Sequence, residues 1–294
     1  MLVKASLEDI EKYGEFVYEL AINQEKSCYP TYADGIKTKE DFFREAKKAI
    51  ESDTGELLLY FHENKAEGWI QYFWIEKDHY LQVSGCNIDV GMQQALEELL
   101  ILFKERFQGY EFYFGCADVN VEAIEFLKRN AFTCIEEDYN NSFFFEDYEL
   151  RPESKNVREI SRDNFEDFCK VHAPIEENTY WNCERVLAKI DSWKIYVYYE
   201  KEEPVGAIFF DKNGEYREIV GLEFLEGKYS KERFQSLLER SLNEGKRSKA
   251  KYLTFLCEEE EQMEEKLCAM KELGFVYVGK YVCYLKKLRK FEER

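Results

Sequence analysis

Metal-ligand patterns, membrane-length apolar runs and low-complexity stretches are missing from this sequence of 294 residues. Four prolines and 15 glycines leave no collagen-like or low-complexity segment. The three histidines, His62, His79 and His172, lack the spacing of metal ligands, so we expect no metal. No apolar run approaches the roughly 18 residues of a membrane span. The start, MLVKASLEDI, has no signal-peptide core. These absences predict a soluble, cytoplasmic protein.

The motifs of several enzyme classes are missing as well. Nine cysteines are scattered along the chain, and no pair has the two-residue spacing of a zinc knuckle or a redox motif. Several lie in apolar strand patterns (Cys86, Cys134 and Cys283), which indicates buried, reduced thiols. The sequence contains neither a Gly-x-Ser-x-Gly elbow nor a Walker loop. Hydrolase and P-loop chemistry therefore have no support.

Positive charge is in short supply. Lys and Arg number 41 against 60 Asp and Glu, a formal net charge of −19. Phosphate contacts require a basic patch, so we expect neither nucleic acid nor an anionic membrane surface as a partner. An acidic field raises the local concentration of cationic substrates such as amines. The same charge could also serve only to keep the protein in solution.

An internal repeat is the strongest positive signal. Lys128 to Phe132 (KRNAF) and Lys271 to Phe275 (KELGF) each precede a strand pattern, and the two phenylalanines lie 143 residues apart. Near the start of each half, Ser6 and Ser161 stand where they can cap a helix. In mid-half, Gly68 and Gly206 follow a polar turn and open an apolar strand. We predict two domains, 1–147 and 157–294, joined by a linker over 148–156.

The apolar pattern predicts one element order for both halves, β-α-α-β-β-β-α-β-α-β-β. Early strands pair as hairpins and later ones cross over through helices, which predicts a mixed β-sheet flanked by helices, of the α/β (α+β) class. The last helix is expected over 121–130 in the first half and 259–273 in the second. Two closing strands should follow it, over 132–137 and 142–145 in the first half and within 276–288 in the second.

This order, twice over, resembles the GCN5-related N-acetyltransferase (GNAT) fold. The residues that carry the resemblance are Asn120-Val121-Glu122-Ala123 with Phe132, and Leu273-Gly274-Phe275. It implies that acetyl-CoA lies in a splay between the fourth and fifth strands. Free backbone amides would hold its pyrophosphate where the fourth strand turns into a helix. A backbone amide on the fourth strand would polarise the thioester, and a Glu or a water relay would deprotonate the amine.

The residues that the resemblance assigns to acetyl-CoA lie in the first half, the more promising cofactor site: Ile88, Val90, Gly91, Met92, Gln93 and Asn120. Of the family's glycines only Gly91 remains, with Gln93 at the second small position. Asp89 would either repel phosphate or cap the helix. In the second half, Glu232 and Phe234 replace the small residues. Lys228, Ser230 and Lys231 could meet a phosphate or form a capped, solvated helix start.

No catalytic residue can be assigned from the sequence. The position of the family's proton-donating Tyr holds Leu127 in the first half and Met270 in the second, and neither side chain can donate a proton. The nearby Tyr139 and Tyr281 are expected to pack on the sheet. Candidate bases on the predicted fourth strands are His79 in the first half and Glu218 or Glu223 in the second. Each of them could instead be an ordinary surface residue.

Three hypotheses follow. The chain transfers an acetyl group from acetyl-CoA to a small-molecule or peptide amine, or it is an inactive GNAT-fold binding or interaction protein, or the splay takes another ligand. In the first case the second half would support the acceptor pocket or act as a pseudo-dimer partner. We expect a monomer with this internal pseudo-dimer, or a homodimer.

Overall fold

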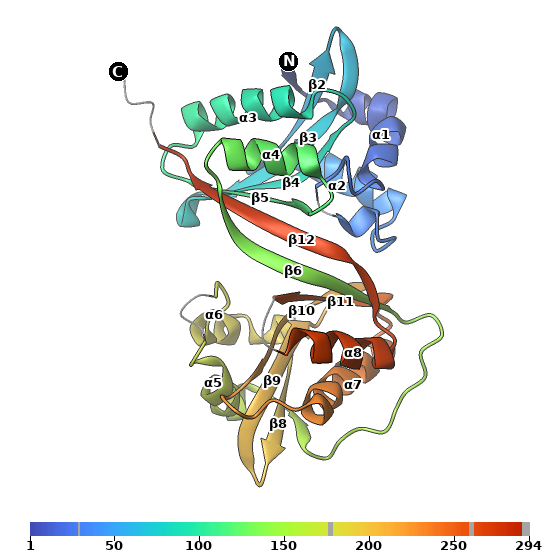
Figure 1. Cartoon of the computed structure of the whole chain (residues 1–294), viewed down its shortest axis with the longest axis vertical. Coiled ribbons are helices and arrows are strands. Elements are labelled where there is room, and N and C mark those ends of the chain that lie inside the picture. Colours follow the sequence, from blue (N-terminus) through green and yellow to red (C-terminus); the bar gives the residue numbers. More distant parts are fainter. Residues whose placement is uncertain (29, 176–178, 259–261, 290–294) are drawn as a thin grey trace. The chain divides into compact units, whose positions relative to one another are not determined.

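A computed structural model describes the whole chain except residues 29, 176–178, 259–261 and 290–294 (Figure 1). Its first half contains β1 (Leu2–Lys4), α1 (Leu7–Ala21), α2 (Lys39–Glu51), β2 (Gly55–His62), β3 (Lys65–Ile75), β4 (Tyr80–Ile88), α3 (Met92–Arg106), β5 (Glu111–Ala117), α4 (Val121–Arg129) and β6 (Thr133–Phe144). Its second half contains β7 (Val157–Glu159), α5 (Phe165–His172), α6 (Cys183–Ala188), β8 (Trp193–Glu200), β9 (Glu203–Asp211), β10 (Tyr216–Phe224), α7 (Lys231–Arg247), β11 (Tyr252–Glu258), α8 (Met263–Leu273) and β12 (Val276–Lys287). Four short 3-10 helices complete the description: η1 (Pro30–Tyr32), η2 (Glu76–Asp78), η3 (Arg162–Asn164) and η5 (Ile190–Ser192).

The repeated element order is confirmed, with one correction at the end of each half. Ser6 accepts a hydrogen bond from Asp9 N–H at α1, and Ser161 forms the equivalent capping box at η3. The two closing strands that we expected are a single strand each, β6 and β12. Asn140 and Asn141 lie between the two expected strands and are residues that favour turns, but they are buried within β6, where pairing outweighs turn propensity. Part of the predicted helix over 259–273 lies outside the described residues.

The last strand of the chain completes the sheet of the first half. By internal contacts the chain forms two units: unit 1 is Met1–Asp138 with the segment from Gly279 onward, and unit 2 is Tyr139–Val278. In unit 1, β12 pairs antiparallel with β5, from Tyr281 opposite Ala117 to Lys287 opposite Glu111. In unit 2, β6 lies next to β11. The units differ from the contiguous ranges 1–147 and 157–294 because each contains part of the closing strand of the other half: β12 from Gly279 onward belongs to unit 1, and β6 from Tyr139 onward belongs to unit 2.

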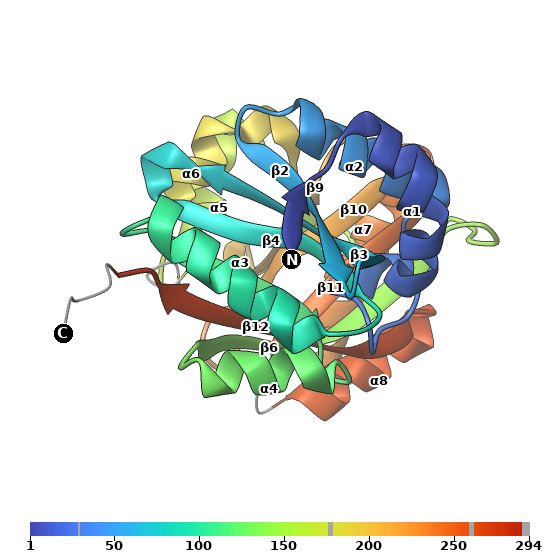
Figure 2. The same ribbon diagram turned by 90° about the horizontal axis from the view of Figure 1, so that it is seen from above.

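Each unit has three layers, with its sheet between two pairs of helices. In unit 1, Leu58 and Tyr60 of β2 pack in the cluster under α3 and α4. The alternate residues Leu57 and Leu59 pack in the cluster under α1 and α2. Figure 2 shows α1 and α3 on opposite sides of these strands. Unit 2 repeats the plan, with Tyr196 facing α7 and α8, and Val197 facing α5 and α6. No helix in the described part of the chain is long and apolar enough to cross a membrane.

The segment predicted as a linker is held against α7 in unit 2. Asn243 of α7 is fully buried, and its side-chain oxygen accepts hydrogen bonds from Tyr148 Oη and Arg151 N–H, both at 2.9 Å. Its amide nitrogen donates to Arg151 O at 2.8 Å. One buried amide thus satisfies backbone groups that a free linker would leave to water.

A glycine on β5 makes room for the exchanged strand. Gly115 lies opposite Cys283, and a Cβ built on Gly115 would stand 1.6 Å from Tyr281 Oη of β12. Only hydrogen at this position lets the Tyr281 ring lie across β5. Packing between β5 and β12 in unit 1 therefore depends on this residue pair.

Gly115→Val should lower the free energy of unfolding of unit 1 by about 1–3 kcal/mol, because the new methyl groups overpack against Tyr281. Urea unfolding, with hydrogen exchange read separately in each unit, measures the effect. In a Tyr281→Ala background the same substitution should do less harm. An equal loss in both backgrounds would show that Tyr281 does not set this requirement.

Candidate functional site

The parallel pair of strands in unit 1 separates partway along its length. β4 pairs with β5 from Tyr80 opposite Glu111 to Val83 opposite Phe114. Beyond these residues the two strands, both fully described, no longer pair, although β4 continues to Ile88. The register against β3 shifts at the same place, leaving Ser84 as an extra residue. The end of β4 therefore presents an edge without a β5 partner, which is the splay that the GNAT resemblance implies.

Unit 2 repeats this irregularity. β10 pairs in parallel with β11 only from Tyr216 opposite Tyr252 to Ile219 opposite Phe255. The register against β9 then shifts at Val220. The two splays also end alike, because Gly68 lies opposite Ile88 and Gly206 lies opposite Phe224. Counting from these glycines, Asn87 in unit 1 corresponds to Glu223 in unit 2.

The helix that follows β4 begins at a glycine with left-handed backbone. Gly91, the N-cap of α3, has φ +82° and offers no side chain to the first helical amides. Asp89 does not cap this helix and instead interacts through its backbone. Its N–H donates to Glu67 O, and its carbonyl accepts from Lys26 Nζ at 2.8 Å. The helix start thus leaves amides that could meet an anion.

The other residues assigned to acetyl-CoA from the sequence are dispersed around this helix start. Ile88 and Met92 are buried in the unit 1 core, and Met92 Sδ lies 3.5 Å from Cys86 Sγ. Val90 is 47% exposed. Gln93 accepts a hydrogen bond from Arg129 on the surface. Their role toward a cofactor stays a prediction.

Asn120 is the N-cap of α4 and is fully buried. Its Oδ1 accepts from Ala123 N–H at 3.2 Å and so caps the helix, while its role toward acetyl-CoA stays a prediction. Its Nδ2 donates to the carbonyl of Ser27 at 3.0 Å, across the end of the splay. This second contact was not foreseen, and it shows what occupies the splay.

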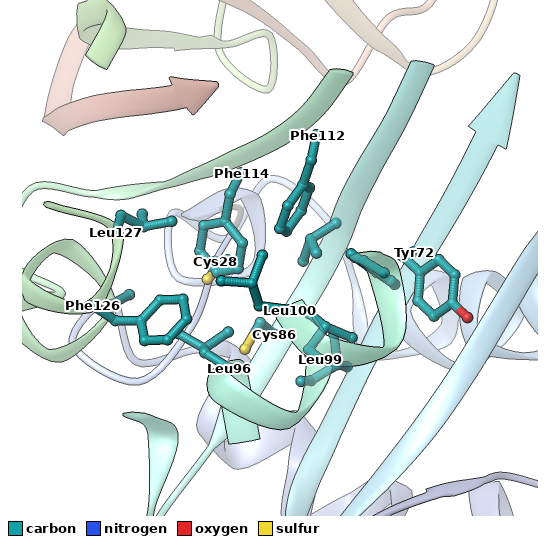
Figure 3. Close-up of a cluster of buried hydrophobic side chains, with 14 of the residues drawn as sticks. Cys28, Tyr72, Cys86, Leu96, Leu99, Leu100, Phe112, Phe114, Phe126 and Leu127 are labelled. Atoms are coloured by element: carbon teal, nitrogen blue, oxygen red, sulfur yellow. The ribbon is translucent and has the colours of Figure 1, made fainter. Parts of the chain in front are cut away.

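A short segment of the chain, Lys26–Cys28, lies along the unpaired edge of β4. We call it the inner segment. Cys28 N–H donates to Cys86 O at 3.0 Å, Ile88 N–H donates to Lys26 O at 3.4 Å, and Ser27 lies opposite Asn87 in an antiparallel bridge. Figure 3 shows Cys28 among the core side chains of unit 1. The splay of unit 1 is therefore filled by the chain itself.

The thiol of Cys28 is a packing group rather than a nucleophile. Its burial raises its pKa well above the usual thiol value, with a further contribution from Cys86. A neutral thiol attacks substrates poorly. The sequence signal for the inner segment was weak: one apolar cysteine between two helices.

The splay of unit 2 is more open. Gly221, Glu223 and Phe224 are partly exposed, whereas all of Gly85–Ile88 is buried. Beyond Ile219, no described residue forms a backbone hydrogen bond with β10 from the β11 side. The described part of the chain therefore fills this edge less completely than it fills the edge of β4.

A largely buried carboxylate lies on this edge, since the side chain of Glu223 is 11% exposed. Both oxygens of Glu223 contact His172 Nδ1, at 2.8 and 2.9 Å, and His172 Nε2 donates to Trp181 O at 2.7 Å. A carbonyl only accepts, so Nε2 carries a proton, and one further proton is shared between Nδ1 and Glu223. Desolvation raises the pKa of Glu223, and His172 opposes that rise. A carboxylate of raised pKa accepts a proton more readily than an ordinary carboxylate does.

The other two bases considered from the sequence do not reach a splay. His79 is exposed, has φ +48°, and lies at the far end of β4. Glu218 is exposed and pairs with Thr254 before the strands separate. At the position of the proton-donating Tyr, Leu127 and Met270 are buried apolar side chains. Of these groups, Glu223 alone combines burial with a place in a splay.

The start of α7 is a capped helix whose nearby positive charges are paired. Ser230 accepts from Arg233 N–H. Lys228 contacts Glu200, and Lys231 contacts Glu272 at 2.6 Å. Phe234, at the second small position of the family's loop, is fully buried in the core. The geometry favours the solvated helix start over a phosphate cradle.

Comparison with protein-family models and with curated proteins finds no match in sequence. Solved structures do resemble this chain. A GCN5-related N-acetyltransferase from Sphaerobacter thermophilus has a TM-score of 0.63 at 12% identity, covering 98% of this chain and 96% of its own. A tandem GNAT protein from the clavulanic acid biosynthesis pathway has a TM-score of 0.57 at 9% identity, covering 97% and 98%. A Drosophila protein has a TM-score of 0.59 at 11% identity, covering 97% and 98%.

These likenesses span nearly the full length of each chain, so they show the fold: two GNAT units in tandem, with a mixed sheet of 12 strands. Because only about one residue in ten is identical, these likenesses show neither the activity nor the site residues of this chain.

His172→Ala should lower the free energy of unfolding by about 3–5 kcal/mol, because it leaves the buried Glu223 without its partner. Urea unfolding at neutral pH measures the loss. His79→Asn is the control, since it changes an exposed histidine to a residue that tolerates left-handed backbone, and it should stay within about 0.5 kcal/mol. Equal effects of the two substitutions would contradict a stabilising role for the buried pair.

The raised pKa of Glu223 should also make stability depend on pH. The folded chain holds this proton more tightly than the unfolded chain does. The contribution of Glu223 to the free energy of unfolding is therefore fully present below the pKa of about 4.3 in the unfolded chain, and it is lost as pH rises through the pKa in the folded chain. Relative to Glu223→Gln, the wild type should lose unfolding free energy from about pH 4 upward. Urea titrations of both proteins measure the difference, and a flat or rising one would contradict the shift.

Proposed function

We propose that the chain is an acyl-CoA-dependent N-acetyltransferase that transfers the acetyl group of acetyl-CoA to a small-molecule or peptide amine in the splay of unit 2. The observation that carries the proposal is Glu223, a largely buried carboxylate on β10 just beyond the bulge, where β11 no longer pairs with the strand. The GNAT fold supports the reaction class. The net charge of −19 favours a cationic acceptor.

Glu223 would act as the general base. An amine is protonated at neutral pH and attacks only after losing a proton, which the carboxylate can accept. The amine nitrogen then bonds to the thioester carbonyl carbon, and the carbon–sulfur bond breaks. The new amide nitrogen gives up its second proton and the CoA thiolate takes one up, so the proton held by Glu223 is the one that the reaction releases. His172 would hold the carboxylate in place, because both Glu223 oxygens face Nδ1 while Trp181 O fixes the ring from the other side.

The set Ile88, Val90, Gly91, Met92, Gln93 and Asn120 stays a prediction for a cofactor site in unit 1. Gly91 supports it, since α3 begins there with amides that no side chain caps. The inner segment opposes it in the present conformation, because Lys26–Cys28 holds the β4 edge next to these residues.

A second candidate is a GNAT-fold protein that binds a ligand or partner without catalysis. The filled splay of unit 1 favours it, as do the paired charges at the start of α7. In both cases we expect neither nucleic acid nor a membrane surface as partner, and a monomer or a homodimer remains the expected state.

Calorimetry with acetyl-CoA and thioester turnover against an amine panel separate these candidates. We expect binding and turnover in the wild type, with kcat lowered about 10²–10⁴-fold in Glu223→Gln because the base is lost. Glu203→Gln, which alters an exposed carboxylate on β9, should keep wild-type turnover. Absence of heat at millimolar acetyl-CoA, or equal turnover in the two variants, would contradict the proposal.

A further inference from the structure

The inner segment uses the hydrogen-bonding groups that a bound ligand would need. Past the bulge, β4 offers the carbonyl of Cys86 and the amide of Ile88 toward the missing β5 partner, and Lys26–Cys28 pairs with both. An extended molecule with alternating amide groups, such as the long arm of acetyl-CoA, would present the same donors and acceptors. The segment and such a ligand cannot occupy this edge together.

The fit of the segment is incomplete at its centre. Ser27 is 1% exposed and Asn87, directly opposite, is 3% exposed. Within the described residues, neither Ser27 Oγ nor Asn87 Oδ1 has a hydrogen-bond partner. Buried polar atoms without partners destabilise the state that buries them. Both atoms lie where the inner segment meets β4. If the segment left this edge, Ser27 Oγ and Asn87 Oδ1 could both form hydrogen bonds with water or a ligand.

Few polar contacts from the described residues hold the segment in place. Beyond the two backbone hydrogen bonds to β4, Asn120 Nδ2 donates to Ser27 O and Lys26 Nζ donates to Asp89 O. The packing of Cys28 in the core adds an apolar contribution. Asn120 therefore links the segment to α4 through a single side-chain hydrogen bond.

We propose that Lys26–Cys28 is an autoinhibitory strand that occupies the cofactor cleft of unit 1 and must leave β4 before acetyl-CoA can bind there. The proposal rests on the proposed function only in naming acetyl-CoA as the ligand. While the segment is paired with β4, acetyl-CoA cannot bind unit 1. The apparent affinity of unit 1 for acetyl-CoA is therefore the affinity of the open form multiplied by the fraction of molecules in which the β4 edge is free. Any change that weakens the segment's attachment raises that fraction.

Asn120→Ser tests the attachment in the full chain. Serine keeps the helix cap but is too short to reach Ser27 O. The amides of Cys28 and Ile88 should then exchange with deuterium about tenfold faster, as for the loss of one net hydrogen bond. Asn182→Ser is the matched control, because Asn182 caps α6 in unit 2 and accepts from Arg185 N–H. It should leave both amides unchanged. Lys26→Met, at a less buried site, should act in the same direction if Asn120→Ser folds poorly.

Acetyl-CoA is then added to the opened variant. We expect the Ile88 amide to regain protection while the Cys28 amide stays exposed, and iodoacetamide should label Cys28 faster than in the wild type. The proposal is overturned if the two amides exchange only with global unfolding in every variant, or if acetyl-CoA leaves Ile88 unprotected after the segment opens. These outcomes differ from failure of the proposed function, which is read from turnover at Glu223 in unit 2.

Discussion

An unpaired strand edge inside a folded unit is the constraint on which both candidate sites depend. The bulges at Ser84 and Val220 end the parallel pairing and leave backbone groups of β4 and β10 without a neighbour. Such groups must be satisfied by the chain, by water or by a ligand. Unit 1 satisfies them with the inner segment. Unit 2 leaves its edge without a described backbone partner and places the carboxylate of Glu223 there.

The repeat therefore preserves architecture while the two copies differ in chemistry. Asn87 of unit 1 and Glu223 of unit 2 occupy equivalent positions. Asn87 lies opposite Ser27 of the inner segment, whereas Glu223 shares a proton with the buried His172. The copies also depend on each other, since β12 closes the sheet of unit 1 and β6 contributes to that of unit 2. Neither half of the sequence contains every strand of its own unit.

Local signals in the sequence were enough to predict much of the fold. Ser6 and Ser161 form the expected capping boxes. Gly68 and Gly206 mark equivalent positions, because the backbone of Asn87 leaves no room for a Cβ at Gly68 and the ring of Phe224 leaves none at Gly206. The exchange of β6 and β12 could not be foreseen, because an apolar strand pattern does not specify its partner. Nor could Glu223 be distinguished from Glu218, since a bulge of unknown position shifts which side chains face a splay. The pairing of Ser27 with Asn87 joins residues far apart in the chain and left no local pattern.

The most direct test of the difference between the two splays is a crystal structure of the wild-type chain soaked with acetyl-CoA. We expect ligand density along β10 between Gly221 and Phe224, next to Glu223, with Lys26–Cys28 still paired to β4. Density along Gly85–Ile88 with the inner segment displaced, and none along β10, would contradict this assignment of the two splays.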